Sequence, residues 1–264
     1  SQITALLLAT FGQLLVALVG GIDLSIGSVI SLVSAMLATI DPAIAIPAVF
    51  AVGATIGLVN GIGVAVFNVH PLIMTLASMT FVQGLALLFL SGPGGKVPPS
   101  LVAMASDPVA GMPPALFWCI GATVLVSILL YRTRFGLHLF AIGANAQSAA
   151  LSGVRVIVPQ ITCYVLCSLS GVLAGIYLTG RGGAGDPRMG LPFGIDSVTA
   201  IALGGVQLTG GIGSAAGAVL GTVTLGLMSN GMNFLDISPF FRTAITGFLL
   251  LAAVSFQRRK AIGI

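Results

Sequence analysis

Charged residues are scarce in this sequence. Only 6% of the 264 residues are charged, and glutamate is absent, whereas soluble domains carry about 25% charged residues. A chain with so few charges cannot cover its surface in water, and a mean hydropathy of +1.14 indicates that lipid surrounds most of it. Composition therefore excludes a soluble globular domain and predicts an all-α, polytopic membrane protein.

Several kinds of site lack their residues or motifs. The three cysteines lie in apolar runs without paired spacing, which predicts neither a disulfide framework nor a zinc site. The sequence contains no GxxxxGK[ST] and no HExxH motif, and its two histidines suggest no Ser/His/Asp arrangement. We therefore expect no cofactor, no metal, no catalytic residue and no ATP bound by this chain itself. Nucleic-acid binding is equally unexpected, because no basic patch with interleaved aromatic residues occurs.

Nine apolar stretches approach the roughly 20 residues that a membrane-spanning helix needs. They cover residues 3–19, 24–40, 43–67, 72–91, 114–131, 158–180, 191–207, 215–231 and 239–256. The stretch 191–207 is the weakest and could be a re-entrant or broken helix, since it holds Asp196 and three glycines. The chain begins without methionine and enters an apolar run directly, so we expect a first helix before residue 1. The prediction is one membrane domain over 1–264 with nine to ten spans.

Basic residues orient these spans. If the tail with Arg258, Arg259 and Lys260 is cytoplasmic, four spans separate it from loop 132–157, which is then cytoplasmic too. Six of the ten Lys and Arg residues fall on that side, as the positive-inside rule expects.

Two short sequences occur twice. Residues 21–23 (GID) recur at 194–196, and residues 57–61 (GLVNG) resemble residues 226–231 (GLMSNG), so that Asn60 and Asn230 each end a span. The two repeats have nearly equal offsets of 173 and 170 residues, and their copies lie in spans of opposite direction. That is the pattern of an inverted-topology repeat, which is common in transporters; chance matches between glycine-rich segments remain the alternative.

Polar residues within the apolar stretches are candidates for function. A charge at the bilayer centre costs at least about 2.5 kcal/mol. Asp23 follows Gly20 and Gly21, so it can either cap the next helix or take part in the pathway or its gating; Asp196 allows the same two interpretations. The candidates for the translocation pathway or gating are Asp23, Ser25, Asn60, Gln83, Asp196 and Asn230.

Loop 132–157 contains a predicted short helix. Asn145 is a suitable N-cap and Gly153 a suitable residue for the turn after the helix. A helix of about two turns is unstable alone in water. It must therefore be held either by a cytoplasmic partner or by the chain's own helix ends.

Three motifs resemble the permease subunits of ribose-type monosaccharide ATP-binding cassette importers, along the whole chain. The first is 20–28 (GGIDLSIGS). The second runs from 132–136 (RTRFG) through 141–145 (AIGAN) to 151–154 (LSGV). The third is 202–205 (ALGG) with 210–213 (GGIG) and 230–231 (NG).

The resemblance implies a multi-pass protein of the bacterial inner membrane with a vitamin-B12-permease-like fold, working as a pair of permease copies. It implies a cytoplasmic ATP-binding subunit and a periplasmic sugar-binding protein as partners. The ATPase would dock on the counterpart of the family's coupling helix, within the cytoplasmic coupling loop 132–157. Its predicted residues are Gly143, Asn145, Ala149, Leu151, Ser152, Gly153 and Arg155.

The sequence departs from the family at three places. In the family, acidic residues often follow the counterpart of Asn145, whereas this sequence has Ala146, Gln147 and Ser148 there. Gly194 replaces a common glutamate, and Ile212 replaces a basic residue. These changes argue against naming one sugar. Import of nucleosides or autoinducer-2-like solutes therefore remains an alternative, as do a secondary transporter without an ATPase and an exporter.

Overall fold

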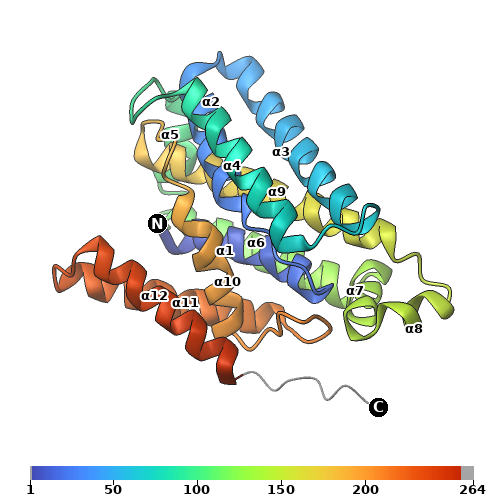
Figure 1. The fold of residues 1–264 in the computed structure, drawn as a ribbon. Coiled ribbons are helices and arrows are strands. Elements are labelled where there is room, and N and C mark those ends of the chain that lie inside the picture. Colours follow the sequence, from blue (N-terminus) through green and yellow to red (C-terminus); the bar gives the residue numbers. More distant parts are fainter. Residues whose placement is uncertain (1, 257–264) are drawn as a thin grey trace.

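The computed structural model describes residues 2–256, and its regular structure is helical apart from two isolated β-bridges (Figure 1). The helices are α1 (Gln2–Leu18), α2 (Ser25–Thr39), α3 (Pro42–Ala65), α4 (Pro71–Phe89), α5 (Pro99–Ser106), α6 (Pro114–Tyr131), α7 (Arg134–Ala144), α8 (Ala146–Leu151), α9 (Ile157–Gly182), α10 (Leu191–Leu203), α11 (Ala215–Phe234) and α12 (Pro239–Phe256). The all-α prediction is confirmed for this range. The basic tail at 258–260, used above to orient the spans, lies outside the described residues.

Each of the nine predicted stretches forms a helix. Five of these helices, α3, α4, α6, α9 and α11, are long and apolar enough to cross a membrane, and α1, α2, α10 and α12 are shorter apolar helices. The stretch 191–207 was predicted either as one span or as a broken helix, and its helix, α10, ends at Leu203. Gly204 and Gly205 follow, and Gly205 has a φ of +76°, which lies outside the helical region. An unwound segment, 204–214, then leads to α11.

Two further short helices lie in stretches that were predicted as connections. α5 falls within 92–113 and begins at Pro99, where a missing N–H costs little. α7 falls within 132–157, and the Thr133 hydroxyl oxygen caps it by accepting from Gly136 N at 3.3 Å. Short amphipathic helices of this kind lack the long apolar run by which the spans were recognised.

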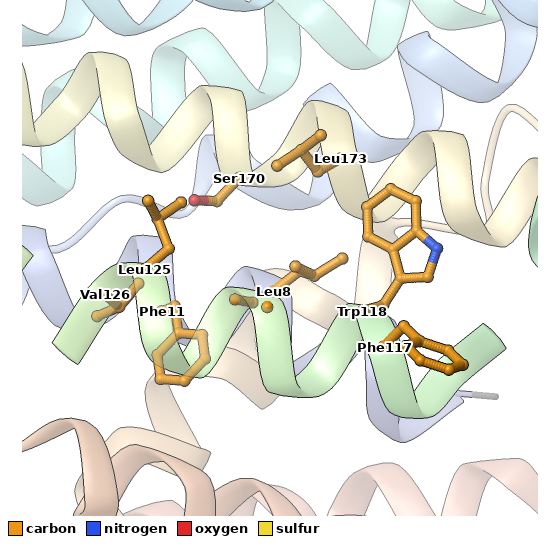
Figure 2. A pocket seen from close by; sticks show the side chains of 10 residues that line it. Leu8, Phe11, Phe117, Trp118, Leu125, Val126, Ser170 and Leu173 are labelled. Atoms are coloured by element: carbon orange, nitrogen blue, oxygen red, sulfur yellow. The ribbon is translucent and has the colours of Figure 1, made fainter. Parts of the chain in front are cut away.

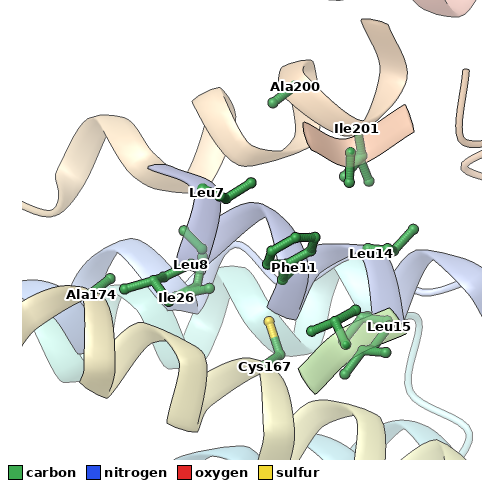
Figure 3. Packing of buried hydrophobic residues seen from close by; sticks show 14 of the residues in the cluster. Leu7, Leu8, Phe11, Leu14, Leu15, Ile26, Cys167, Ala174, Ala200 and Ile201 are labelled. Carbon is green, nitrogen blue, oxygen red and sulfur yellow. The ribbon is translucent and has the colours of Figure 1, made fainter. Parts of the chain in front are cut away.

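The core is built around α1 and α9. α1 is buried over nearly its whole length, and its apolar side chains pack between α9 and α10 (Figure 3). Phe11 and Leu14 are completely or almost completely buried there, and Cys167 and Ala174 meet α1 from α9. α2 and α3 also pack along α9, so a single helix connects most of the bundle.

The outer helices face away from this core. α3, α4 and α6 expose many large apolar side chains, among them Ile73, Phe81, Leu88 and Leu125. Such continuous apolar surfaces are rare on soluble monomers but expected where lipid is the solvent. The arrangement confirms the expectation drawn from the composition.

Glycine ladders bring the helices together. Gly53, Gly57 and Gly61 all lie on the face of α3 that meets α9, and a Cβ atom built on Gly57 would lie 2.6 Å from Tyr164 O. Only a residue without a side chain fits at that distance, so the two backbones pack directly. These glycines therefore serve packing within the chain.

The molecule has two distinct ends (Figure 1). One end carries α7 and α8, the turn at 66–70 and the unwound segment 204–214. The turn between α11 and α12 lies at the opposite end, as does the start of α1. The chain therefore places the predicted coupling loop far from the helix starts that carry Gln2 and Arg242.

Candidate functional site

The predicted short helix is present and capped as expected. Asn145 is the N-cap of α8, and its side-chain oxygen accepts from Ser148 N at 2.9 Å. Gly153 takes a left-handed φ of +86°, which ends the helix in a tight turn. We call residues 143–153, which join α7 to α9, the α7–α8 corner.

α8 has one inward and one outward face. Ala149 is buried at 6% exposure, whereas Leu151 is 85% exposed. Gln147 is exposed one turn before Leu151, on the same outward face. Ser152 and Arg155 are exposed as well. Leu151 is therefore an exposed apolar side chain on a short helix outside the apolar bundle.

The chain's own helix ends hold the α7–α8 corner through backbone contacts between glycines. A Cβ atom on Gly143 would lie 1.8 Å from Leu18 O and 2.3 Å from Gly211 N, and one on Gly210 would lie 2.9 Å from Gly20 N. Gly211 N also donates to Leu18 O at 2.9 Å. We call Gly20, Gly143, Gly210 and Gly211 the glycine junction. It connects the corner to the end of α1 and to the unwound segment after α10.

Asp23 lies in the break between α1 and α2 and is completely buried. Its carboxylate oxygen Oδ1 accepts from Ser25 N at 2.9 Å and from Ser25 Oγ at 2.6 Å. Asp23 therefore satisfies the first N–H group of α2, as a capping residue would, although it stands one position before the N-cap, which is Leu24. The side-chain amide of Gln13 bonds the backbone of Asp23, its nitrogen donating to Asp23 O at 2.9 Å and its oxygen accepting from Asp23 N at 3.1 Å.

The hydrogen bonds around Asp23 and Ser25 extend to α3 and α4. Asn60 Nδ2 donates to Ser25 Oγ at 2.9 Å, and the Ser78 hydroxyl donates to Asn60 Oδ1. We call Gln13, Asp23, Ser25, Asn60 and Ser78 the Asp23 cluster. It links four helices by hydrogen bonds, and its three members that were predicted to line a pathway, Asp23, Ser25 and Asn60, are all fully buried.

Gln83 lies elsewhere. Its side-chain nitrogen donates to Pro187 O at 2.7 Å and so ties α4 to the connection between α9 and α10. Its carbonyl oxygen is buried without a hydrogen-bond partner. The described contacts of Gln83 thus hold a loop in place.

Asp196 and Asn230 come together in a different pocket. α1, α10, α11 and α12 surround it, and Ser229 and Arg242 line it too. We call this the Asp196 pocket. Asp196 is the sixth residue of α10, so the expectation that it caps a helix is wrong; the turn that contains it is already helical.

A larger hollow than the Asp196 pocket has a different chemistry. It has a volume of about 400 Å³ and lies between α1, α6 and α9, and Figure 2 shows leucine, phenylalanine and tryptophan side chains around it. Ser170 points toward it, but its hydroxyl donates to Leu166 O at 2.9 Å. The hollow therefore suits apolar chains and offers little to a hydroxylated solute.

Sequence reasoning missed Gln13 and Ser78 in the Asp23 cluster, and Ser229 and Arg242 in the Asp196 pocket. Arg242 had a usable signal, since it is an isolated charge within an apolar stretch. Gln13 and Ser78 had none beyond their polarity, because only the folded arrangement brings them to Asp23 and Asn60.

Comparison with known proteins places the chain among transport permeases. A family profile described as "Branched-chain amino acid transport system / permease component" matches residues 1–254. No solved protein structure matches the chain.

Curated relatives are similar over most of the chain. The ribose import permease protein RbsC of Bacillus subtilis (strain 168) is 34% identical over 262 residues, which cover 96% of this chain and 81% of that protein. The L-arabinose transport system permease protein AraH of Escherichia coli (strain K12) is 37% identical, covering 76% of this chain and 62% of that protein. The galactose/methyl galactoside import permease protein MglC of Salmonella typhimurium (strain LT2) is 32% identical, covering 85% and 69%.

Proposed function

The chain belongs to the branched-chain amino acid transport system / permease component family, and we propose that it is the membrane pore of an ATP-driven monosaccharide importer. The observation that carries this proposal is the similarity to a ribose import permease over 96% of the chain. Relatives named for arabinose and galactose transport support the same class of solute. The sequence contains no GxxxxGK[ST] motif, and in this proposal a separate subunit would hydrolyse ATP.

In the bacterial inner membrane, α1, α2, α3, α4, α6, α9, α10, α11 and α12 would each cross once. With the basic tail in the cytoplasm, as the charge bias predicts, nine alternating spans would put the α7–α8 corner in the cytoplasm and the turn between α11 and α12 outside. A vitamin-B12-permease-like arrangement and an inverted repeat remain predictions of the resemblance and of the repeated GID sequence.

The α7–α8 corner is the proposed contact for the ATP-binding subunit. The outward face of α8, with Gln147 and Leu151, would enter a groove of that subunit. Ala149 faces inward, so its role would be to seat α8 on the bundle. The remaining predicted coupling residues are Gly143, Asn145, Ser152, Gly153 and Arg155.

The glycine junction supplies a route for the motion. A movement of the corner would act directly on the end of α1 and on segment 204–214, since backbones there are in contact. α1 leads to Asp23 and α2, and segment 204–214 leads back to α10 and Asp196. Binding of ATP would thus shift helices on both sides of the path by differential contact with the ATPase states.

Alternating access would follow. A periplasmic sugar-binding protein would deliver the solute at the end that carries the Asp196 pocket. A second permease copy, identical or similar, would form the other half of the path. The chain would catalyse no reaction, and its role would be to open the solute path to one side of the membrane at a time.

The test is transport by the assembled importer in liposomes, with its ATPase and its binding protein. We expect ribose, arabinose or galactose uptake that requires ATP, and a loss of at least tenfold for Leu151→Asp. Leu137→Asp is the matched control, since Leu137 is 68% exposed on neighbouring α7. Uptake driven by an ion gradient without ATPase would contradict the proposal, as would transport of nucleosides alone. Full uptake by Leu151→Asp would remove the coupling role of α8.

A further inference from the structure

The Asp196 pocket brings together polar groups from four helices that are far apart in the sequence. Asp196 comes from α10, Ser229 and Asn230 from the last turns of α11, Arg242 from the first turn of α12, and Gln2 from the start of α1. The starts of α1 and α12, which carry Gln2 and Arg242 of this pocket, lie at the end of the molecule opposite α8 (Figure 1). Phe193 and Ile3 add apolar walls.

The two charges in this pocket do not pair directly. Asp196 and Arg242 are close enough to interact electrostatically. No hydrogen bond or ion pair joins them among the described residues. The one described side-chain bond of Arg242 is from Nη1 to Asn233 Oδ1 at 3.4 Å. A guanidinium has five N–H donors and a carboxylate can accept several hydrogen bonds, so most of this bonding capacity is not used by the described residues, and both side chains line the pocket.

The chemistry of the gap favours a neutral hydroxylated solute. A hydroxyl group can donate to the Asp196 carboxylate and accept from the Arg242 guanidinium, and such charge-assisted bonds are about twice as strong as neutral ones. An anion would be repelled by Asp196 and a cation by Arg242. The amide of Asn230 and the hydroxyl of Ser229 add neutral donors and acceptors, while Phe193 provides an apolar wall of the kind found in small-molecule sites.

We propose that the Asp196 pocket is a binding station for hydroxyl groups of the transported solute at the outer mouth of the path. The proposal rests on the proposed function and names where the sugar is first held by the permease. The space between the side chains is about 80 Å³, which holds a few water-sized groups. The pocket therefore takes one edge of a sugar, with its hydroxyls inserted between the two charges.

One other solute could use both charges. A zwitterionic amino acid would place its ammonium group on Asp196 and its carboxylate on Arg242. The neutral hydrogen-bonding residues beside the pair favour the sugar, because a zwitterion would leave them unused. Leucine uptake therefore enters the test as the competing result.

The experiment uses the complete importer in liposomes and two neutral replacements, the isosteric Asp196→Asn and the shorter Arg242→Gln. Asp107→Asn and Arg188→Gln are matched controls, since both residues are exposed and neither lines the pocket. We expect each pocket variant to lose tenfold or more in sugar uptake at limiting concentration. Stimulation of ATP hydrolysis by the sugar-loaded binding protein should stay near that of the unmutated importer, because docking and coupling lie elsewhere.

A second readout separates binding from folding. Uptake of ribose is compared with uptake of its 2-deoxy and 3-deoxy analogues. The unmutated importer should prefer ribose over at least one deoxy analogue, and Asp196→Asn should reduce that preference severalfold, whereas a merely structural defect would lower all three equally. Unchanged uptake and preference in both pocket variants would overturn the proposal, and so would loss of leucine uptake with sugar uptake intact. If the unmutated importer moves no sugar at all, the proposed function fails instead.

Discussion

The sequence GID occurs twice, and its two aspartates have opposite surroundings. Asp23 is fully buried, and its Oδ1 atom accepts from the backbone and the hydroxyl of Ser25. Asp196 is only partly buried and faces a pocket that it shares with Arg242, with no direct bond between them. The same three residues thus hold the start of a helix at one place and line a pocket at the other. Neighbouring helices, and not the motif, decide which.

The local backbone explains the difference. Before Asp23 the chain turns at Gly20, which has a φ of +79°, so Asp23 precedes a new helix and its carboxylate can reach the free N–H groups. Before Asp196, α10 has already begun at Leu191. The N–H groups around Asp196 belong to helical turns, and its side chain is left to face the neighbouring helices.

Removal of each carboxylate should give the largest difference in stability between the two regions. Asp23→Ala deletes a cap and leaves the Ser25 N–H buried without a partner, which should lower the free energy of unfolding by about 2–4 kcal/mol. Asp196→Ala should change it by less than about 1 kcal/mol, because no hydrogen bond is lost. Thermal unfolding of the purified permease in detergent measures both. Equal losses would show that the two aspartates are structurally equivalent after all.

The glycines two residues before the aspartates give a smaller contrast. A Cβ atom on Gly21 would lie 2.5 Å from the Tyr164 hydroxyl oxygen and 2.9 Å from Val16 Cγ1, and both side chains are buried. Gly21→Ala should therefore cost about 1–3 kcal/mol by overpacking. On Gly194 the nearest atom, Leu24 O, is 3.0 Å away, so Gly194→Ala should cost clearly less. The same unfolding measurement tests this, and a larger loss for Gly194→Ala would contradict the described packing.

The two asparagines of the second repeated pattern should differ least. Asn60 bonds both Ser25 and Ser78, so Asn60→Leu should destabilise the permease by about 1–2 kcal/mol. Asn230 is exposed at the pocket, and Asn230→Leu should stay within about 0.5 kcal/mol. Hydrogen exchange of the α2 and α11 backbones locates each effect. Loosening of α11 by Asn230→Leu, with α2 unchanged by Asn60→Leu, would reverse the comparison.

Much of the fold could be predicted from the sequence because its signals are local. Apolar length located nine helices, and Pro114 marked the start of α6 as expected. Asn145 and Gly153 gave both ends of α8, since capping depends on residues within one turn. α5 and α7 were missed because they are too short for the apolar criterion.

The partners of the polar side chains could not be predicted. Gln13 meets Asp23 across the break between α1 and α2, and Asn60 reaches Ser25 from α3. Asp196 and Arg242 come from helices joined through a third one. Such pairs depend on how helices rotate about their axes in the bundle, and a single sequence carries little information on that rotation. The six candidate pathway residues therefore lie in three places: the Asp23 cluster, the Asp196 pocket and the contact of Gln83 with Pro187.

The brevity of α10 has a consequence for the energy barrier to the solute. Thirteen residues rise only about 20 Å, whereas the hydrocarbon core of a bilayer is about 30 Å thick. If α10 lines the path as proposed, the helical wall beside it would be thinner by about a third than the membrane around it. A small shift of the unwound segment 204–214 would then open the path to either side, and the distance over which the importer must exclude water would be short.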